Sequence, residues 1–312
     1  MENRTLGRTG LKVSEVGYGA LELGRDWSFP VGDDFGRPGE RDAIRALNAV
    51  LDAGINFIDT APAYELSEER IGKAISHRRD EFYLATKVGE RKNDGEDSLY
   101  DYSGKATAAF IDESLRRMKT DYIDLLQIHS APVEVIHRGE TLGVMKRAQE
   151  AGKVRFIGMS GSIESAIAAV TDGSYDTVQV TYNIVQREAE EELFSLCREN
   201  DIGVIVKDGL AAGRLTDKAK ALPDEWAADR ERVMRLEEEF VLKGSWHPHY
   251  LLAALSVAEV SLRWLLANAT VSTVIAGSRK IGNIVSNASV SDGRYFTAEQ
   301  VQQIISVAEA SA

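Results

Sequence analysis

The chain has 312 residues, of which 44% are hydrophobic and 28% are charged, and its formal net charge is -12. This composition is ordinary for a soluble globular protein, and such an acidic chain repels nucleic acid and anionic membrane surfaces. The opening stretch MENRTLGRTG has no apolar signal-peptide region and no run is long enough to span a bilayer, so we expect a cytoplasmic protein. The single cysteine, Cys197, excludes an intramolecular disulfide and is expected to be a small buried side chain.

In chain order, the first predicted element is a β-hairpin made of RTLG and LKVS, with glycines at its turn. Short apolar runs then alternate with longer segments of helical period. Eight runs have the character of buried strands: EVGYGA, INFID, FYLATKV, IDLLQIH, VRFIGMS, TVQVTYN, GVIVKD and VSTVIAG. The helices predicted between and after them cover 40–54, 67–76, 105–119, 141–152, 162–173, 190–200, 250–268 and 297–311. Thr297 and Gln300 have the spacing of a capping box at the start of the terminal helix.

Continuous apolar strands that alternate with helices are typical of parallel strands buried on both faces. Eight such units favour an α/β fold of the closed (β/α)8 TIM barrel type over a doubly wound open sheet, because no G-x-G-x-x-G turn follows the first strand run. No Pro- or Gly-rich linker divides the chain, so we expect one barrel domain over 1–312. Long loops over 21–39, 89–103 and 208–228 are predicted at the C-terminal face, which carries the active site in such barrels.

Polar residues lie in or at the end of successive predicted strands. They are, in chain order, Asp59, Lys87, His129, Ser160, Gln179 and Lys207. Each alone has an ordinary structural explanation, such as a strand end at Asp59 or a satisfied core histidine at His129. In a barrel, however, these side chains form a ring at one mouth, where neighbouring strands lie about 5 Å apart. A buried lysine without a partner is costly, so Asp59 is the expected partner of Lys87.

Tyr64 follows the second strand in the stretch INFIDTAPAYELSEERIG, in which Ser67 is expected to cap the next helix. A phenol is a poor acid near neutral pH, and we expect the Lys87 cation to lower the pKa of Tyr64. His129 can donate a hydrogen bond to a substrate carbonyl or assist the proton transfer. Together these groups supply a proton to an oxygen that becomes negative, as carbonyl reduction requires. No side chain carries hydride, so a nicotinamide cofactor is implied.

Five segments together form a specific pattern. They are RTLGRTGLKVSEVGYGALELG, INFIDTAPAYELSEERIGKAI, YLATKVG, DYIDLLQIH and SLRWLLANATVSTVIAGSRKIGNIVSNAS. On these segments, which span nearly the whole chain, the sequence resembles the aldo-keto reductase family. The resemblance implies reduction of an aldehyde or ketone to an alcohol by NADPH. It also implies that Tyr64 is the proton donor, that Lys87 and Asp59 tune it, and that His129 orients the carbonyl.

The resemblance further implies a nicotinamide cofactor held extended across the C-terminal mouth. The positions matching the family's cofactor contacts are Gly19, Ala20, Leu21, Asp59, Ser160, Gln179, Lys207, Asp208, Leu210, Gly213, Gly277, Ser278, Arg279, Asn283 and Asn287. Ser278, Arg279 and Lys280 at a helix start suit a 2′-phosphate, so NADPH is expected and NADH is the alternative. Arg279 and Lys280 also have a plainer reading, as solvated surface charges.

Two departures from the family pattern indicate an outlying branch that binds the cofactor through altered contacts. Gly161 follows Ser160, where the family usually has asparagine. Lys207 and Asp208 stand where a residue that stacks on the nicotinamide usually precedes a Ser-Pro-Leu segment. The methylene groups of a lysine can cover one face of the ring, but they cannot stack as an aromatic ring does.

Two other functions stay open on the sequence alone. The scaffold also resembles the β-subunits of potassium channels, in which the barrel binds nucleotide but acts as a regulatory partner. A metal-dependent hydrolase needs clustered ligands, and the pair His247 and His249 precedes a helix rather than ending a strand, so no metal is expected.

The loop aromatics either line an apolar substrate pocket or pack the loops onto the barrel. They are Trp27, Phe29, Tyr100, Tyr102 and Trp226. The expected partner is a small carbonyl compound, with no nucleic acid or membrane.

Overall fold

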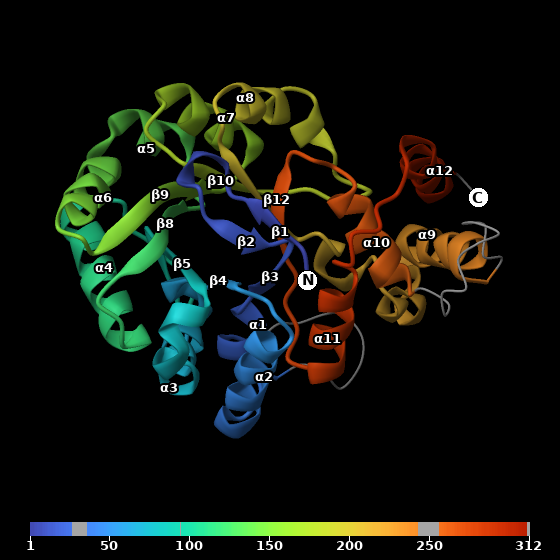
Figure 1. The fold of residues 1–312 in the computed structure, drawn as a ribbon, viewed down its shortest axis with the longest axis horizontal. Helices are drawn as coiled ribbons and strands as arrows, with labels where there is room; N and C mark the ends of the chain where they lie inside the picture. Colours follow the sequence, from blue (N-terminus) through green and yellow to red (C-terminus); the bar gives the residue numbers. More distant parts are fainter. Residues whose placement is uncertain (27–35, 94, 243–255, 311–312) are drawn as a thin grey trace.

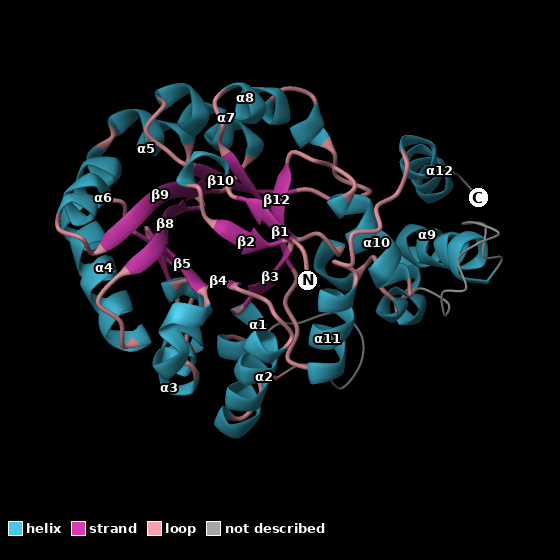
Figure 2. Cartoon of the chain, viewed as in Figure 1, coloured by secondary structure: helices cyan, strands magenta, loops and turns pink. Residues whose placement is uncertain are grey.

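The computed structural model describes residues 1–26, 36–93, 95–242 and 256–310. Eight parallel strands close into a barrel (Figures 1 and 2). In chain order they are β3 (Val16–Gly19), β4 (Phe57–Asp59), β5 (Tyr83–Val88), β8 (Ile123–His129), β9 (Val154–Ser160), β10 (Thr177–Thr181), β11 (Gly203–Lys207) and β12 (Val271–Ile275). Each of them lies within one of the eight predicted runs, so the predicted (β/α)8 barrel is confirmed. The predicted hairpin is also present, as β1 (Asn3–Thr5) paired with β2 (Lys12–Ser14).

Helices surround the barrel in Figure 2, and α9 and α12 lie together on one side of it in Figure 1. The helices are α1 (Leu21–Gly24), α2 (Glu40–Asp52), α3 (Ser67–Ala74), α4 (Gly104–Met118), α5 (Val133–Arg138), α6 (Glu140–Glu150), α7 (Ile163–Asp172), α8 (Leu193–Glu199), α9 (Ala227–Leu236), α10 (Val257–Leu266), α11 (Ile281–Ser289) and α12 (Ala298–Glu309). The capping box of Thr297 and Gln300 is present at α12. The predicted cap at Ser67 is wrong, because Ser67 is the first residue of α3 and its hydroxyl donates to the Ala20 carbonyl at 2.9 Å.

The loops predicted to be irregular contain short elements instead. The segment 21–39 starts with α1, while Trp27 and Phe29 lie outside the described residues. The segment 89–103 holds an antiparallel pair, β6 (Glu90–Arg91) and β7 (Leu99–Tyr100). The segment 208–228 contains several 3-10 turns, the first over Ala211–Gly213. Two-residue strands and single turns have no repeating apolar pattern, so periodicity in the sequence does not reveal them.

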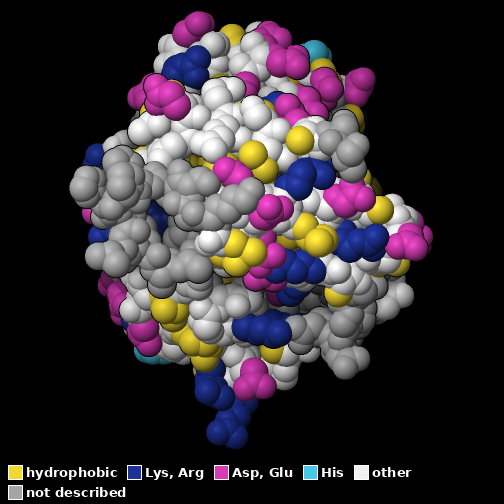
Figure 3. All heavy atoms as spheres, turned by 90° about the vertical axis from the view of Figure 1, so that its right-hand side faces the viewer, with side chains coloured by type: hydrophobic (Ala, Val, Ile, Leu, Met, Phe, Trp, Pro, Cys, Tyr) yellow, Lys and Arg dark blue, Asp and Glu magenta, His cyan; other side chains and the backbone are white. Residues whose placement is uncertain are grey.

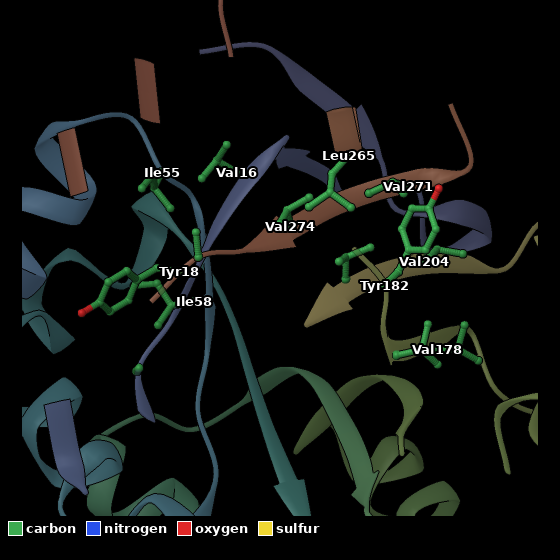
Figure 4. Close-up of a cluster of buried hydrophobic side chains, with 14 of the residues drawn as sticks. Val16, Tyr18, Ile55, Ile58, Val178, Tyr182, Val204, Leu265, Val271 and Val274 are labelled. Atoms are coloured by element: carbon green, nitrogen blue, oxygen red, sulfur yellow. The ribbon is translucent and has the colours of Figure 1, made fainter. Parts of the chain in front are cut away.

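Two apolar clusters lie on opposite faces of the strands. Figure 4 shows part of the larger one, in which strand residues such as Val16, Val204 and Val274 face helix residues such as Leu265. The smaller cluster fills the N-terminal end of the barrel interior, where residues of the hairpin meet residues of four strands. Its buried members are Leu6, Leu11, Val13, Phe57, Ala85, Leu125 and Ile205. Because side chains alternate along a strand, the residues two positions further along point into the same interior, nearer the C-terminal mouth.

A buried carboxylate ties the two ends of the chain to the barrel. Glu15, which is 1% exposed, precedes β3. Its carboxylate accepts a hydrogen bond at 2.6 Å from Nε of Arg4, which lies in the N-terminal hairpin. It also accepts hydrogen bonds from Tyr295 Oη at 2.6 Å and from Ser291 Oγ at 2.9 Å. Strand β12 pairs with β3, so the eighth barrel strand in chain order closes the ring against the first barrel strand.

The surface view of the side that carries α9 and α12 shows acidic and basic side chains intermixed, with scattered hydrophobic ones (Figure 3). The net charge of -12 is therefore not concentrated on this face. Among the residues that the structure describes, no helix combines the length and the apolar character that crossing a bilayer requires.

Candidate active site

A buried polar network surrounds Asp59 at the C-terminal ends of the strands. Lys87 Nζ lies 2.5 Å from Asp59 Oδ2 and donates to the carbonyl oxygen of Thr60 at 2.9 Å. Gln127 and Gln179 each donate a side-chain amide hydrogen to Asp59 Oδ1, at 3.0 and 2.9 Å. Asp59 and Lys87 are fully buried, so the ion pair is screened from water and both carboxylate oxygens have donors. The structure thus brings Asp59 and Lys87 together as the sequence predicted.

Tyr64 ends the 3-10 turn Pro62–Tyr64 that follows β4, and the residue is partly exposed. Lys87 Nζ lies 3.4 Å from the Tyr64 hydroxyl oxygen. The ring of His129 meets the ring of Tyr64 edge-on, with centroids 6.0 Å apart. The four residues predicted to be catalytic therefore meet in one cluster.

The backbone directly after Tyr64 adopts an uncommon conformation. Glu65 has φ 50°, in the region that favours glycine, and its carboxylate is held by Arg37 Nη1 at 2.7 Å. A positive φ at a non-glycine residue persists when the surroundings fix it, and such positions gather at functional sites. The contact with Arg37 therefore helps to fix the turn that carries Tyr64.

The pKa of Tyr64 differs in net direction from the expectation. Burial raises the pKa of Tyr64, and the nearby Lys87 cation lowers it, but burial is the stronger influence and the net pKa lies above the ordinary value. For Lys87 itself, burial lowers the pKa, yet Asp59 and Tyr64 together hold it above its ordinary value. The site therefore contains a protonated phenol beside a lysine cation, which is the form of a proton donor.

His129 closes β8, and Nδ1 of its ring lies 2.9 Å from Glu90 Oε2 on β6. Burial lowers the pKa of His129, and Glu90 opposes that shift. Burial acts to raise the pKa of Glu90, but the contacts with His129, together with hydrogen bonds from Ser98 and Tyr100, outweigh it and hold this pKa at about 2. The sequence prediction missed Glu90. The available signal was a carboxylate three residues beyond Lys87, at the C-terminal face where a predicted histidine also lies.

The two residues expected to hold a nicotinamide carboxamide lie side by side. Ser160 Oγ at the end of β9 donates to Gln179 Oε1 at 2.7 Å. Gly161 follows, and a Cβ built there would come within 2.4 Å of Met159 Cε. The glycine that departs from the family pattern thus occupies a position where a side chain requires Met159 to shift.

The end of β11 and the residues after it form a second part of the mouth in which the sequence departs from the family. Lys207 is partly buried, and within the described part of the chain its ammonium group makes no hydrogen bond or ion pair. Burial and the neighbouring Lys87 lower the pKa of Lys207. Asp208 accepts a hydrogen bond from the backbone of Ala212. The remaining predicted residues of this segment are Leu210, which directly precedes the 3-10 turn, and Gly213, which is its last residue.

A hollow of about 450 Å³ lies between the start of α11 and helix α2. Its lining residues are Gly36, Pro38, Asp42, Arg45, Arg279 and Ile281. Arg279 was predicted, whereas Arg45 was missed because its position on α2 gave no sequence signal for this contact. Two guanidinium groups at one hollow suit a phosphate. The described residues therefore fit the phosphate end of a dinucleotide.

The other predicted cofactor residues lie at the ends of β3 and β12 and on α11. Gly19 ends β3 and is followed by the buried Ala20 and by Leu21 at the start of α1. A Cβ at Gly277 would lie 2.8 Å from the carbonyl oxygen of Gly19, so the ends of β12 and β3 approach too closely for a side chain there. The last predicted positions are Ser278, which is buried, and Asn283 and Asn287 on α11, of which Asn287 is buried and Asn283 exposed.

The loop aromatics divide into different roles. Tyr102 packs against the larger core cluster and donates its hydroxyl to the His129 carbonyl oxygen at 2.8 Å. Trp226 also packs against that cluster, whereas Tyr100 is 56% exposed.

Cys197 is buried, as predicted. Among the described residues there is no group of His, Cys, Asp and Glu side chains that could hold a metal ion, and His247 and His249 lie outside them.

A family model described as "Aldo/keto reductase family" matches residues 15–309. The chain belongs to the aldo-keto reductase family. It is 30% identical over 308 residues to "Uncharacterized oxidoreductase YqkF" of Bacillus subtilis, covering 97% of this chain and 95% of that protein. It is 28% identical over 305 residues to "NADH-specific methylglyoxal reductase" of Escherichia coli, covering 89% and 90%. The solved holo form of the aldo-keto reductase AKR11C1 from Bacillus halodurans superposes with a TM-score of 0.81, at 29% identity, and covers 100% of this chain and 97% of that one.

Membership makes the protein an oxidoreductase that depends on a nicotinamide cofactor. The predicted family, fold and enzyme class are thereby confirmed.

Proposed function

We propose that this aldo-keto reductase uses NADPH to reduce the carbonyl group of a small aldehyde or ketone to an alcohol, with Tyr64 as the proton donor. The observation that carries the proposal is the buried pair of Asp59 and Lys87, whose ammonium lies 3.4 Å from the hydroxyl of Tyr64, a residue that is partly exposed. The catalytic roles of Asp59, Tyr64, Lys87 and His129 are part of this proposal, as are a single domain over 1–312 and a cytoplasmic location.

Tyr64, Lys87 and Asp59 have separate roles in the proposed proton transfer. The nicotinamide, when bound, supplies the hydride. Tyr64 donates its proton to the carbonyl oxygen as that oxygen becomes negative, and the Lys87 cation stabilises the phenolate that is left. Asp59 keeps Lys87 in position, because its other oxygen is held by Gln127 and Gln179. In the direction of alcohol oxidation the same phenolate takes the proton back.

The first test is the substitution Tyr64→Phe, assayed with NADPH on a panel of aldehydes and ketones at the reduced-nicotinamide absorbance band. We expect kcat to fall about 10²- to 10⁴-fold, because the general acid is lost, while the Kd for NADPH stays within about twofold. Tyr122→Phe is the matched control, since Tyr122 lies outside the mouth and is expected to leave kcat unchanged.

Unchanged turnover in the Tyr64→Phe variant contradicts the proposed mechanism. Tight nucleotide binding with no turnover on the whole panel by the unmodified protein favours the regulatory alternative that the sequence left open. Turnover that depends on Tyr64 excludes that alternative.

The preference for NADPH rests on Arg45 and Arg279, which line one hollow beside α11. A 2′-phosphate is the feature that NADPH has and NADH lacks, and arginine pairs bind phosphate strongly. We expect Arg45→Met and Arg279→Met each to weaken NADPH binding about tenfold or more and to change NADH binding less than about twofold.

Fluorescence titration with both reduced cofactors measures this preference. Arg41→Met on the same helix is the matched control, because Arg41 is exposed and does not line the hollow. Equal losses for NADPH and NADH, or tighter binding of NADH by the unmodified protein, contradict the preference for NADPH.

A further inference from the structure

The contact of His129 with Glu90 joins the mouth to the short hairpin β6–β7. Nδ1 of His129 lies 2.9 Å from Glu90 Oε2, and Glu90 is 6% exposed. The ring nitrogen and the carboxylate are in close contact, although Nδ1–H is not aligned for a straight hydrogen bond. Such catalytic contacts are often misaligned before substrate binds. Within the described residues, Nε2 of the ring makes no hydrogen bond.

The hairpin has further contacts that fix Glu90 and His129 relative to each other. The Tyr100 hydroxyl donates to Glu90 Oε1 at 3.3 Å, and the Tyr102 hydroxyl donates to the carbonyl oxygen of His129 at 2.8 Å. Gly89 has φ 98°, and a Cβ there would lie 2.3 Å from the ring of Tyr102. Glycine therefore lets the chain turn tightly from β5 into the hairpin, with Tyr102 packed against the turn.

The groups around His129 have opposing charges. Glu90 supplies a carboxylate from β6, while Lys87 on β5 and Lys207 on β11 supply cations. Tyr64 contacts the edge of the ring from the turn after β4. Burial and the two lysines lower the pKa of His129, and Glu90 is the group that raises it. Removing the carboxylate therefore leaves only influences that disfavour the imidazolium.

We propose that Glu90 is a positioning residue for His129, which keeps the imidazole proton on Nδ1 and turns Nε2 toward the substrate. The proposal rests on the carbonyl-reductase function proposed above, and it goes beyond the four catalytic residues. A carboxylate only accepts hydrogen bonds, so the nitrogen that faces it carries the proton. The neutral ring then has a bare Nε2, which accepts a hydrogen bond but cannot donate one.

This tautomer makes the contribution of His129 depend on pH. His129 donates a hydrogen bond from Nε2 to the carbonyl oxygen only as the doubly protonated imidazolium. Without Glu90 the neutral ring is free to hold its proton on Nε2 and to donate at any pH. We therefore expect kcat/KM for reduction to fall about tenfold per pH unit above the pKa of His129 in the unmodified protein. In the Glu90→Gln variant we expect this slope to flatten.

The test is a pH titration by NMR of protein labelled with ¹⁵N in its histidine rings, without substrate or cofactor. The signals of His129 are assigned from their loss in His129→Gln. We expect the neutral ring of His129 to be protonated at Nδ1 in the unmodified protein. In Glu90→Gln we expect its pKa to fall by about 1 unit or more, with Nε2–H populated. Glu96→Gln is the matched control, since it makes the same change in the same hairpin on an exposed side chain.

Each outcome of this titration counts for or against the positioning role. A neutral His129 protonated at Nε2 in the unmodified protein overturns it, and so does an unchanged pKa in Glu90→Gln. Glu90→Asp retains the charge and is expected to give an intermediate pKa, which keeps the test decisive where Glu90→Gln does not fold. The titration needs no turnover, so it stays informative where the carbonyl assays fail, and such a failure counts only against the proposed function.

Discussion

The two ends of the barrel are built on the same strands but are filled with different chemistry. At the N-terminal end, Phe57, Ala85 and Leu125 form a buried apolar layer with the hairpin. Two residues further along the same three strands stand Asp59, Lys87 and Gln127, which form the polar network of the mouth. Because strand side chains repeat every two residues, one strand provides core packing and then chemistry on the same face. We therefore expect different substitutions on a single strand to alter core stability and the proposed catalysis separately.

The largest effect is expected from Lys87→Met, which puts an apolar side chain into the polar layer. Asp59 then stays buried without its cation, and the loss of one member of a buried pair costs about 3–5 kcal/mol of unfolding free energy. We also expect kcat for carbonyl reduction to fall at least about 10²-fold, since the Tyr64 phenolate loses its stabilising charge. Denaturant unfolding and steady-state rates measure the two effects. Lys105→Met, an exposed change on α4, is the control, and retention of full activity by Lys87→Met contradicts the proton-donor arrangement.

A second substitution alters the apolar layer at the N-terminal end of the barrel. Leu125→Ala leaves a cavity in this layer, which typically costs about 2–5 kcal/mol of unfolding free energy. The network of the mouth is untouched, so we expect kcat and KM at 25 °C to stay within about twofold. Thermal and chemical unfolding with parallel kinetics measure both quantities. Leu242→Ala, at a leucine that is 72% exposed, serves as the control. A large loss of activity in folded Leu125→Ala shows that the two layers are not independent.

The smallest effect is expected from Gln127→Leu, which extends the apolar layer by one residue on β8. One donor to Asp59 Oδ1 is lost, worth about 1 kcal/mol. The buried Gln127 Oε1, which has no hydrogen-bond partner among the described residues, is removed at the same time. We therefore expect a change of less than about 1 kcal/mol in stability and a fall in kcat of less than about tenfold. Gln149→Leu on the surface of α6 is the control, and a loss as large as that of Lys87→Met refutes the view that Gln179 can hold Asp59 alone.

The strands and the predicted catalytic cluster could be derived from sequence because each strand is a continuous apolar run with a polar end. Asp59, Lys87 and His129 close such runs, and a closed barrel brings their ends together. Tyr64 was found from its position one turn beyond Asp59. For these residues the local sequence pattern and the barrel fold both indicate the same position, so their placement at the mouth could be predicted.

The rest depends on contacts between segments that have no local signature. Arg45 belongs to an ordinary amphipathic helix, and only the packing of α2 beside α11 gives it a role. Ser67 has the residue type of a cap, yet its hydroxyl bonds Ala20, a residue far away in the chain. The net direction of the Tyr64 pKa depends on how deeply the ring is buried, and a sequence does not report this quantity. Residues whose roles arise from tertiary contacts thus require coordinates.

The closure of the ring by β12 against β3 also has a consequence for synthesis. A ribosome makes Val16–Gly19 well before Val271–Ile275, which is the neighbour of this strand on one side. Until then the backbone groups along one edge of β3 have no strand partner, and Glu15 lacks its bonds to Ser291 and Tyr295. An open strand edge is a template for pairing with other chains. A sheet that forms around β3 before β12 is made therefore has an exposed edge, and pairing with β12 covers that edge.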